Sequence, residues 1–146
     1  MITVLIADPK PAIRAACRRI LQPEKGIRIV GETRNGLETI ASAIKHKPRL
    51  LLLDFNLCSG AFSSLLPIIC EKSPKTKVIL FTRFTVSEAK VLKALSLGAR
   101  GYLDKKVLDT FLAKAVRVVA LGEVWVPRKM VARILGLLAS LTIKSH

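Results

Sequence analysis

Four consecutive leucines, Leu50 to Leu53, are followed directly by Asp54. A run this short and this uniformly apolar is typical of a strand that is covered on both faces, because a strand with one solvated face would alternate apolar and polar residues. Such strands occur mainly in parallel sheets that carry helices on either side. The run therefore indicates a layered α/β fold, and its last residue is a carboxylate.

The same alternation of short apolar runs and longer segments of helical period recurs along the chain. Strands are predicted over residues 2–7, 27–33, 50–54, 77–82 and 101–103. Helices are predicted from residue 11 to 21, over 37–44, between 60 and 69, over 90–97 and over 107–121. The pattern predicts a doubly wound α/β domain with five parallel strands and five helices.

An appended helix is predicted after this domain, over residues 128–138. Its apolar residues recur at helical spacing and are Val131, Ile134, Leu135 and Leu138. We divide the chain into a domain over residues 1–122 and a linker with the appended helix over 123–146. The apolar stripe packs either on its own domain or against a second copy in a homodimer, and the sequence leaves both open.

Several classes of protein are excluded by what the sequence lacks. Its apolar stretches are far shorter than the roughly 18 to 20 residues of a membrane-spanning helix, and its start does not resemble a signal peptide. We therefore expect a cytoplasmic protein without a membrane partner. The cysteines and histidines show no metal-binding spacing, and no P-loop, dinucleotide fingerprint or nucleophile elbow is present, so we predict no independent enzyme.

The net positive charge predicts attraction to polyanions, but it does not identify a particular partner. The 25 lysines and arginines exceed the 10 acidic residues, which gives a formal net charge of +15 and attracts nucleic acid. The basic residues are spread from Lys10 to Lys144 without a long block or interleaved aromatic residues. That distribution favours a solvated basic surface over a dedicated nucleic-acid site.

Polar side chains stand where the predicted strands end. They are Asp8, Asp54, Thr82, Asp104 and Lys105. Ligands of open α/β sheets bind outside the carboxyl ends of the strands, so we expect these side chains to meet at one edge. A carboxylate nucleophile, a hydroxyl donor and an ammonium group are the groups that phosphoryl transfer requires, because its catalysis is mostly positioning and charge neutralisation.

Roles follow from the chemistry of each group. Asp54 is the candidate nucleophile that would form an aspartyl phosphate. Asp8 and Asp54, with the main-chain carbonyl of Asn56, could supply oxygen ligands to Mg²⁺. The Thr82 hydroxyl and the Lys105 ammonium are candidates to contact the phosphoryl oxygens.

The ordered set of Asp8, Asp54, Thr82 and Lys105 on successive strand ends resembles the signature of bacterial response-regulator receiver domains, over about residues 1–122. The run from Gly98 to Leu103 and the Gly-Glu-Val-Trp-Val-Pro run of residues 122–127 are similar to the branch whose output is usually a LuxR-type helix-turn-helix domain. The resemblance implies a flavodoxin-like fold with strand order 2-1-3-4-5.

The resemblance also implies a function in two-component signal transduction. Asp54 would receive a phosphoryl group from a phosphohistidine on a sensor histidine kinase, and Thr82 and Tyr102 would act as switch residues that report it. Transcription would be controlled by DNA binding through an output domain that these 146 residues do not include. A fragment of a longer regulator and a stand-alone regulator are both open.

The main departure from the family pattern is Pro9, which stands where the second of two adjacent acids is normal. Since that acid is usually the direct Mg²⁺ ligand, we expect Mg²⁺ binding to be weakened or absent. Lys10 is a candidate cation near the same pocket, and Arg83 stands where a small residue is usual. The alternative function is therefore a degenerate, phosphorylation-independent receiver that acts as a protein- or nucleic-acid-binding module.

Overall fold

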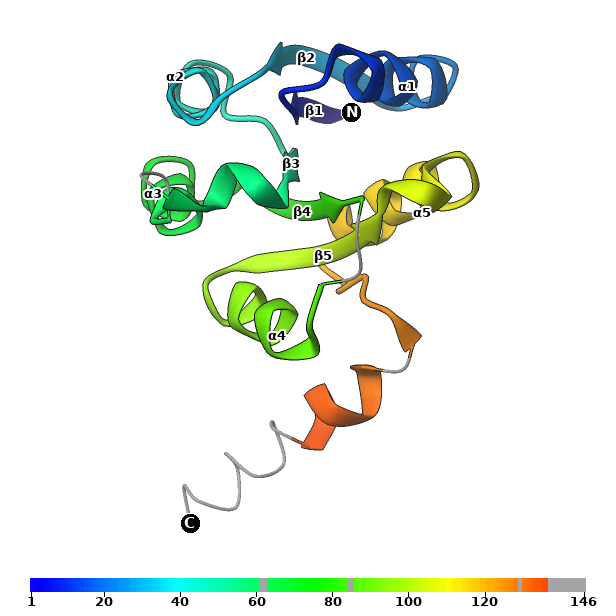
Figure 1. The fold of residues 1–146 in the computed structure, drawn as a ribbon. Helices are drawn as coiled ribbons and strands as arrows, with labels where there is room; N and C mark the ends of the chain where they lie inside the picture. The colour runs from blue at the N-terminus through cyan, green and yellow to red at the C-terminus, as the bar shows by residue number, and fades with distance from the viewer. Residues whose placement is uncertain (61–62, 84–85, 129, 137–146) are drawn as a thin grey trace.

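A computed structural model describes residues 1–60, 63–83, 86–128 and 130–136. Within these residues the strands form a five-stranded sheet in the order β2-β1-β3-β4-β5, and each neighbouring pair is parallel. Figure 1 shows the strands in this order with helices on both sides of the sheet. The predicted doubly wound, flavodoxin-like fold is confirmed.

The strands agree closely with the sequence pattern. They are β1 (Ile2–Ala7), β2 (Ile27–Thr33), β3 (Leu50–Asp54), β4 (Lys77–Thr82) and β5 (Ala99–Asp104). All five residues of β3 are buried, as expected of a strand covered on both faces. Only β5 differs, because it extends beyond the predicted residues 101–103 at both ends.

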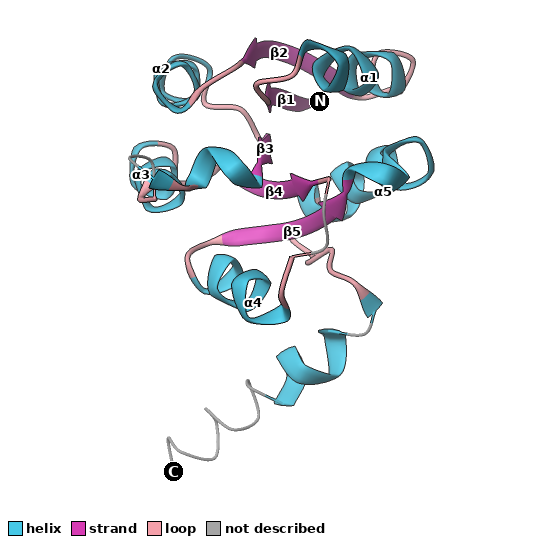
Figure 2. Ribbon diagram, in the orientation of Figure 1, coloured by secondary structure: helices cyan, strands magenta, loops and turns pink. Residues whose placement is uncertain are grey.

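Two apolar cores lie on opposite faces of the sheet (Figure 2). The first face is covered by α1 (Pro11–Leu21) and α5 (Leu108–Ala120). The second is covered by α2 (Gly36–His46), α3 (Leu65–Lys72) and α4 (Glu88–Ser96). In the described parts of the chain, no helix combines the length and apolar character needed to cross a bilayer.

Two short 3₁₀ helices were not predicted, and both follow a strand that ends in a carboxylate. They are η1 (Phe55–Cys58) after β3 and η3 (Lys105–Val107) after β5. Because four residues or fewer show no periodicity, the sequence pattern could not reveal them. Their effect is to turn the chain sharply at the edge of the sheet where the polar strand ends lie.

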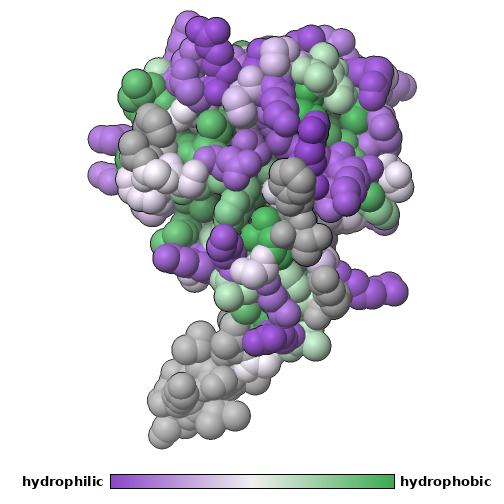
Figure 3. Space-filling view, viewed as in Figure 1, coloured by the Kyte–Doolittle hydropathy of each residue, from purple (hydrophilic) through white to green (hydrophobic). Residues whose placement is uncertain are grey.

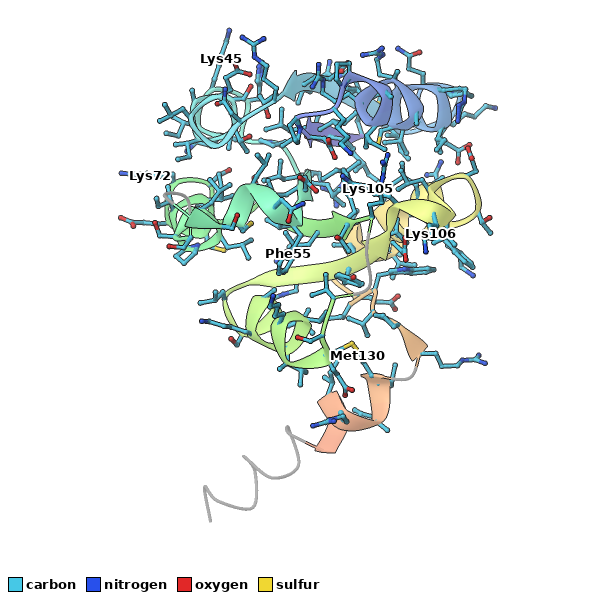
Figure 4. All side chains as sticks on the ribbon, in the orientation of Figure 1. Lys45, Phe55, Lys72, Lys105, Lys106 and Met130 are labelled. Carbon is cyan, nitrogen blue, oxygen red and sulfur yellow. The ribbon has the colours of Figure 1, made fainter. Side chains whose placement is uncertain are left out.

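The appended C-terminal helix is present at residues 128 and 130–136. In the single chain Val131 and Leu135 of its apolar stripe are 42% and 59% exposed, so they do not pack on their own domain, and packing against a second copy stays a prediction. The buried residue is instead Met130, which is 2% exposed and lies between this helix and the body of the domain (Figure 4). Of the other two predicted stripe residues, Ile134 is half-buried and Leu138 falls outside the described residues.

Candidate functional site

Asp8 and Asp54 meet at the carboxyl edge of the sheet. β1 and β3 are paired so that Ala7 lies opposite Leu53, which sets the two acids beside each other one residue further on. Both carboxylates are almost fully enclosed, with 0% and 2% of each residue exposed. Isolated buried carboxylates are costly, so the geometry requires a compensating cation.

Lys105 supplies that cation. Its Nζ lies 2.7 Å from Oδ2 of Asp8 and 3.0 Å from Oδ1 of Asp54, and its side chain is 7% exposed. Figure 4 shows Lys105 reaching from the end of β5 toward this edge. We refer to Asp8, Asp54 and Lys105 as the acid pocket, in which one ammonium bridges two carboxylates.

A turn after β5 decides which of two adjacent lysines enters the acid pocket. The Asp104 carboxylate accepts a hydrogen bond of 2.8 Å from the backbone N–H of Lys106 and so caps η3. This cap fixes the chain direction at Lys105, whose side chain is buried, while Lys106 is exposed. The sequence could favour Lys105 only by its position after the strand, whereas the structure gives the physical cause.

Two residues that the sequence did not single out also support the acid pocket. The Lys105 ammonium lies 5.3 Å from the centre of the Phe81 ring, within the range of a cation–π contact. The Arg14 guanidinium donates a hydrogen bond of 2.7 Å to the backbone carbonyl of Asp8. Phe81 directly precedes Thr82, which the sequence did single out. This adjacency is the only feature of the sequence that points to Phe81.

Burial dominates the electrostatics of Asp54. It raises the pKa of the carboxyl group above its ordinary value, because the charged form loses its hydration. The hydrogen bond and the charge of Lys105 oppose this rise in pKa, the charge of Asp8 adds to it, and the backbone N–H of Asn56 opposes it as a donor. Lys105 is thus the main group that favours the ionised form of Asp54.

The oxygen atoms of the acid pocket fit a hard cation. Asp8 Oδ2 is buried, and it lies 2.7 Å from the Lys105 ammonium. The Asn56 carbonyl accepts a hydrogen bond of 2.7 Å from the Ser59 hydroxyl, which leaves it a second lone pair. Mg²⁺ commonly uses one or two carboxylates together with waters, so this donor set fits it.

This set is nevertheless small. Across the described ranges, no group of three or more Asp, Glu, His or Cys side chains could hold a metal ion by itself. Pro9 contributes no oxygen from its side chain at the position next to Asp8. A bound Mg²⁺ would therefore depend on Asp8, Asp54 and the carbonyl of Asn56.

The predicted switch residues lie on neighbouring strands. Thr82 is 4% exposed and pairs in register with Asp104 of β5. Tyr102 is half-buried, and the backbone N–H of Val86 donates to its hydroxyl. Burial, the largest effect, raises the pKa of Tyr102. Thr82 therefore belongs to the same sheet edge as the acid pocket, whereas the Tyr102 hydroxyl meets the chain that leads from β4 into α4.

Lys10, Arg83 and Cys58 also follow the ends of strands at the edge of the sheet where the acid pocket lies. Lys10 contributes its backbone N–H, which donates a hydrogen bond of 2.8 Å to Oδ1 of Asp8. The Lys10 and Arg83 side chains form no ion pair with any described residue, and both residues are exposed. Cys58 is half-buried near Asp54, and burial followed by the Asp54 charge raises the pKa of its thiol to about 12.

Comparison with protein families matches residues 4–117 to the response regulator receiver domain. The chain belongs to this family. Receiver domains generally bind Mg²⁺ at their phosphorylation site, and response regulators work with sensor histidine kinases and reach DNA through output domains. The match spans the sheet and both of its helical layers.

Two curated relatives are regulatory proteins by name. The receiver is 32% identical over 129 residues to the oxygen regulatory protein NreC of Staphylococcus epidermidis, which covers 87% of this chain and 58% of NreC. It is 33% identical over 124 residues to the uncharacterized transcriptional regulatory protein YxjL of Bacillus subtilis, which covers 84% of this chain and 56% of YxjL. The chain thus spans little more than half the length of these relatives.

Solved receiver domains have the same fold. The isolated receiver domain of RcsB from Salmonella enterica serovar Typhimurium superposes with a TM-score of 0.80 at 25% identity, covering 93% of this chain and 99% of that one. The receiver domain of a putative response regulator NarL from Mycobacterium tuberculosis gives 0.76 at 27% identity, covering 84% and 98%. The chain is therefore similar in fold to solved receiver domains.

Proposed function

We propose that this receiver accepts a phosphoryl group on Asp54 from a phosphohistidine of a sensor histidine kinase. The observation that carries the proposal is the acid pocket itself: a buried carboxylate at a strand end, held 3.0 Å from an ammonium that also contacts a second acid. Membership of the receiver family supports the assignment. Control of transcription through an output domain is part of this proposal, and the name of the relative YxjL, a transcriptional regulatory protein, supports it.

The bonds that form and break in the transfer belong to the donor and to Asp54. An oxygen of the Asp54 carboxylate attacks the phosphorus atom, and a P–O bond forms as the P–N bond to the donor imidazole breaks. The electron pair of that bond returns to the imidazole nitrogen, which takes up a proton from solvent. Asp54 then carries an acyl phosphate, and the kinase histidine is free.

Charge balance assigns the remaining roles. Lys105 neutralises part of the negative charge that the phosphoryl group brings, and its contact with Asp8 keeps it at the sheet edge. The Thr82 hydroxyl donates to a phosphoryl oxygen. Mg²⁺, when bound by Asp8, Asp54 and the Asn56 carbonyl, supplies additional positive charge at the transferred group.

The decisive experiment is intact-mass measurement after incubation with a small-molecule phosphodonor, with and without Mg²⁺. We expect one phosphoryl adduct on the wild-type chain, none on Asp54→Ala, and an unchanged adduct on Asp109→Ala, which removes an exposed carboxylate. An adduct that survives Asp54→Ala would reject the assignment of the acceptor. A folded wild-type chain that forms no adduct would reject the proposed function.

A second candidate function is favoured by two observations together. Pro9 removes an acid from the acid pocket, and the chain carries a formal net charge of +15. In this second candidate function, the domain is a phosphorylation-independent module that binds a protein or a nucleic acid. Lys105 then balances the charge of the two carboxylates permanently. The same mass experiment separates the two functions, because this candidate requires that no adduct forms.

A further inference from the structure

Basic side chains gather at the edge of the sheet opposite the acid pocket, although they are spread out along the sequence. In this parallel sheet every strand begins at that edge, and each connecting helix runs back and ends there. Four charged segments lie at it, residues 22–26, 45–49, 71–77 and 117–123. They hold three acidic residues and eight basic ones, which are Lys25, Lys45, Lys47, Arg49, Lys72, Lys75, Lys77 and Arg117. We call these eight basic residues the basic edge.

Hydrogen bonds to main-chain carbonyls hold the four segments together. The Arg117 guanidinium donates to the carbonyl of Lys25 at 2.8 Å, which joins the end of α5 to the chain before β2. The Arg49 guanidinium donates to the carbonyl of Ala120 at 3.0 Å, which joins the chain before β3 to the end of α5. The N–H of Lys77 donates to the carbonyl of Arg49 at 2.9 Å and so adds the start of β4. The basic edge is therefore one continuous surface.

Most of these positive charges have no carboxylate partner. In the part of the chain that the structure describes, the one ion pair of the basic edge joins Arg117 to Glu24 at 3.4 Å, and the other seven members form none. The Lys47 ammonium and the Arg49 guanidinium donate instead to main-chain carbonyls. These bonds fix the positions of the two groups and leave their charge available to an external anion.

Helix dipoles explain only part of this arrangement. Lys45, Lys72 and Arg117 lie in the last turns of α2, α3 and α5, where a cation meets the negative end of the dipole. Lys25 and Lys75 lie in loops, beyond the last turn of any helix. Figure 4 shows Lys45 and Lys72 extending outward from α2 and α3. The basic edge is thus more than a set of helix ends, and it presents its cations to solvent.

The acidic residues are distributed in the opposite way. Six of the ten lie at the end of a strand or in the first turn of a helix, at the edge that holds the acid pocket. They are Asp8, Glu38, Asp54, Glu88, Asp104 and Asp109. Folding therefore separates charges that alternate along the chain, and a polyanion is attracted most strongly to the basic edge, where it meets few carboxylates.

Duplex DNA matches the basic edge in charge density and in the kind of contact it offers. Neighbouring strands lie about 4.8 Å apart, so the edge spans about 14 Å from β2 to β4, and duplex DNA carries about eight phosphate charges over that length. The four segments contain no Phe, Tyr or Trp on which unpaired bases could stack. Of the large apolar residues in these described segments, only Leu121 is exposed, which is too little to insert into a membrane. On the face that Figure 3 shows, the side chains over α1, β2 and α2 are likewise mostly hydrophilic.

We propose that the basic edge binds the phosphate backbone of duplex DNA without regard to base sequence. The inference goes beyond the proposed function and does not depend on it, because the acid pocket lies at the other edge of the sheet. Exposed ammonium and guanidinium groups pair with phosphate oxygens, and counterions released from the duplex drive the association. In a regulator with a DNA-binding output domain, the receiver thus adds backbone contacts to those that the output domain makes.

Two triple variants of the 146-residue chain test where the DNA binds. The basic-edge variant combines Lys25→Gln, Lys72→Gln and Lys75→Gln. It keeps the hydrogen bonds of the basic edge, because Lys25 and Lys72 accept them through main-chain carbonyls. The matched control replaces three exposed cations of the opposite edge and combines Arg83→Gln, Lys90→Gln and Lys106→Gln. Each variant removes three positive charges, so the formal net charge falls from +15 to +12 in both.

Fluorescence anisotropy with a short labelled duplex gives the dissociation constant of each variant over a range of salt concentrations. We expect the basic-edge variant to bind at least about tenfold more weakly than wild type. The slope of its log affinity against log salt should be smaller by about 2 to 3, because each lysine that contacts a phosphate contributes about 1. The control should bind within about threefold of wild type, and Asp54→Ala should bind as wild type does.

Urea midpoints close to that of wild type establish that both triple variants are folded. Equal weakening in the two variants overturns the basic edge as the site, because binding then follows total charge. Tighter binding to a single strand, or to vesicles of phosphatidylcholine and phosphatidylserine, overturns duplex DNA as the partner. Loss of DNA binding in Asp54→Ala overturns the independence from the acid pocket. A chain that binds DNA at the basic edge and forms no phosphoryl adduct supports this inference and rejects the proposed function.

Discussion

Lys105 and Lys106 are adjacent in sequence, but their ammonium groups meet different surroundings. Lys105 lies within 3.0 Å of two buried carboxylates, while Lys106 is exposed. The ion pairs of Lys105 are the kind whose disruption leaves an uncompensated buried charge. The stability of the edge of the sheet thus depends on one of the two neighbours.

Lys105→Met is expected to lower the free energy of unfolding by about 3 to 5 kcal/mol at neutral pH, since it leaves Asp8 and Asp54 buried without a cation. Lys106→Met is the matched control and should change it by less than about 0.5 kcal/mol. Urea denaturation of both variants checks this. If both variants lose the same free energy of unfolding, the ion pairs of Lys105 are not the cause of the loss in Lys105→Met.

Asp54→Asn tests the raised pKa of Asp54. Burial raises the pKa of Asp54 in the folded state, so at a pH between the two pKa values the folded protein holds a proton that the unfolded chain has released. The bound proton stabilises the folded state. This stabilisation is lost as the pH rises through the folded-state pKa. The variant removes the cost of ionisation. We expect it to be more stable than wild type at neutral pH, with the difference shrinking in mild acid, as measured by urea midpoints. A difference that grows in acid would contradict this.

The sequence predicted which residues of the acid pocket would meet, but not how they are held. Asp8, Asp54 and Lys105 were found because polar residues at the ends of apolar strands share one edge in a parallel sheet. Phe81 and Arg14 act through a ring face and a contact with a main-chain carbonyl. Neither role leaves a pattern in the order of residues, so both depend on the folded geometry.

Among the strands, β5 differs most from its predicted bounds. Its burial alternates along the strand, as expected for a strand near the edge of a sheet, and the short predicted run covered only its centre. Gly101 sits where the β4–β5 register shifts. A Cβ atom at this position would lie 2.9 Å from Cγ1 of Ile79, closer than atoms of this kind approach. β5 therefore needs a glycine here for its approach to β4.

Gly101→Ala should lower the free energy of unfolding by about 1 to 3 kcal/mol, because the added methyl group forces β5 away from Ile79. Gly136→Ala, in the C-terminal helix, is the control, since a Cβ atom there meets nothing within 4 Å. It should be neutral, or stabilise the helix by up to about 1 kcal/mol. The midpoint of thermal unfolding of both variants checks this. If both variants lose the same stability, the loss comes from replacing any glycine and not from the contact with Ile79.

Long periodic elements were predicted well, whereas the chain around α3 was not. Four strands have the predicted bounds, and Pro11 begins α1 at a position that needs no N–H donor. α3 begins only at Leu65, with Pro67 in its first turn, where proline costs no hydrogen bond. In the appended helix the buried contact with the domain is made by Met130, which lies outside the apolar stripe of the sequence. Tertiary packing selects the buried face of so short a helix.

Over the whole molecule, a net charge of +15 should give weak, sequence-independent binding to duplex DNA. We expect a dissociation constant of roughly 10⁻⁴ to 10⁻⁶ M at physiological salt, and at least about tenfold weaker binding at roughly 200 mM than at roughly 50 mM salt. Fluorescence anisotropy with a labelled duplex measures both, and a probe with an uncharged backbone is the control. A dissociation constant that does not change with salt concentration would indicate that the binding is not electrostatic.

The order of the strands has a consequence for how the protein is made. β1 is synthesised first but lies between β2 and β3, and the face that α1 covers is completed only by α5, about 100 residues later. At roughly 5 to 20 residues per second, translation keeps that face open for about 5 to 20 seconds. Ribosome-bound chains that end before residue 108 should therefore be cut readily by protease, and should resist it once residue 120 has left the exit tunnel.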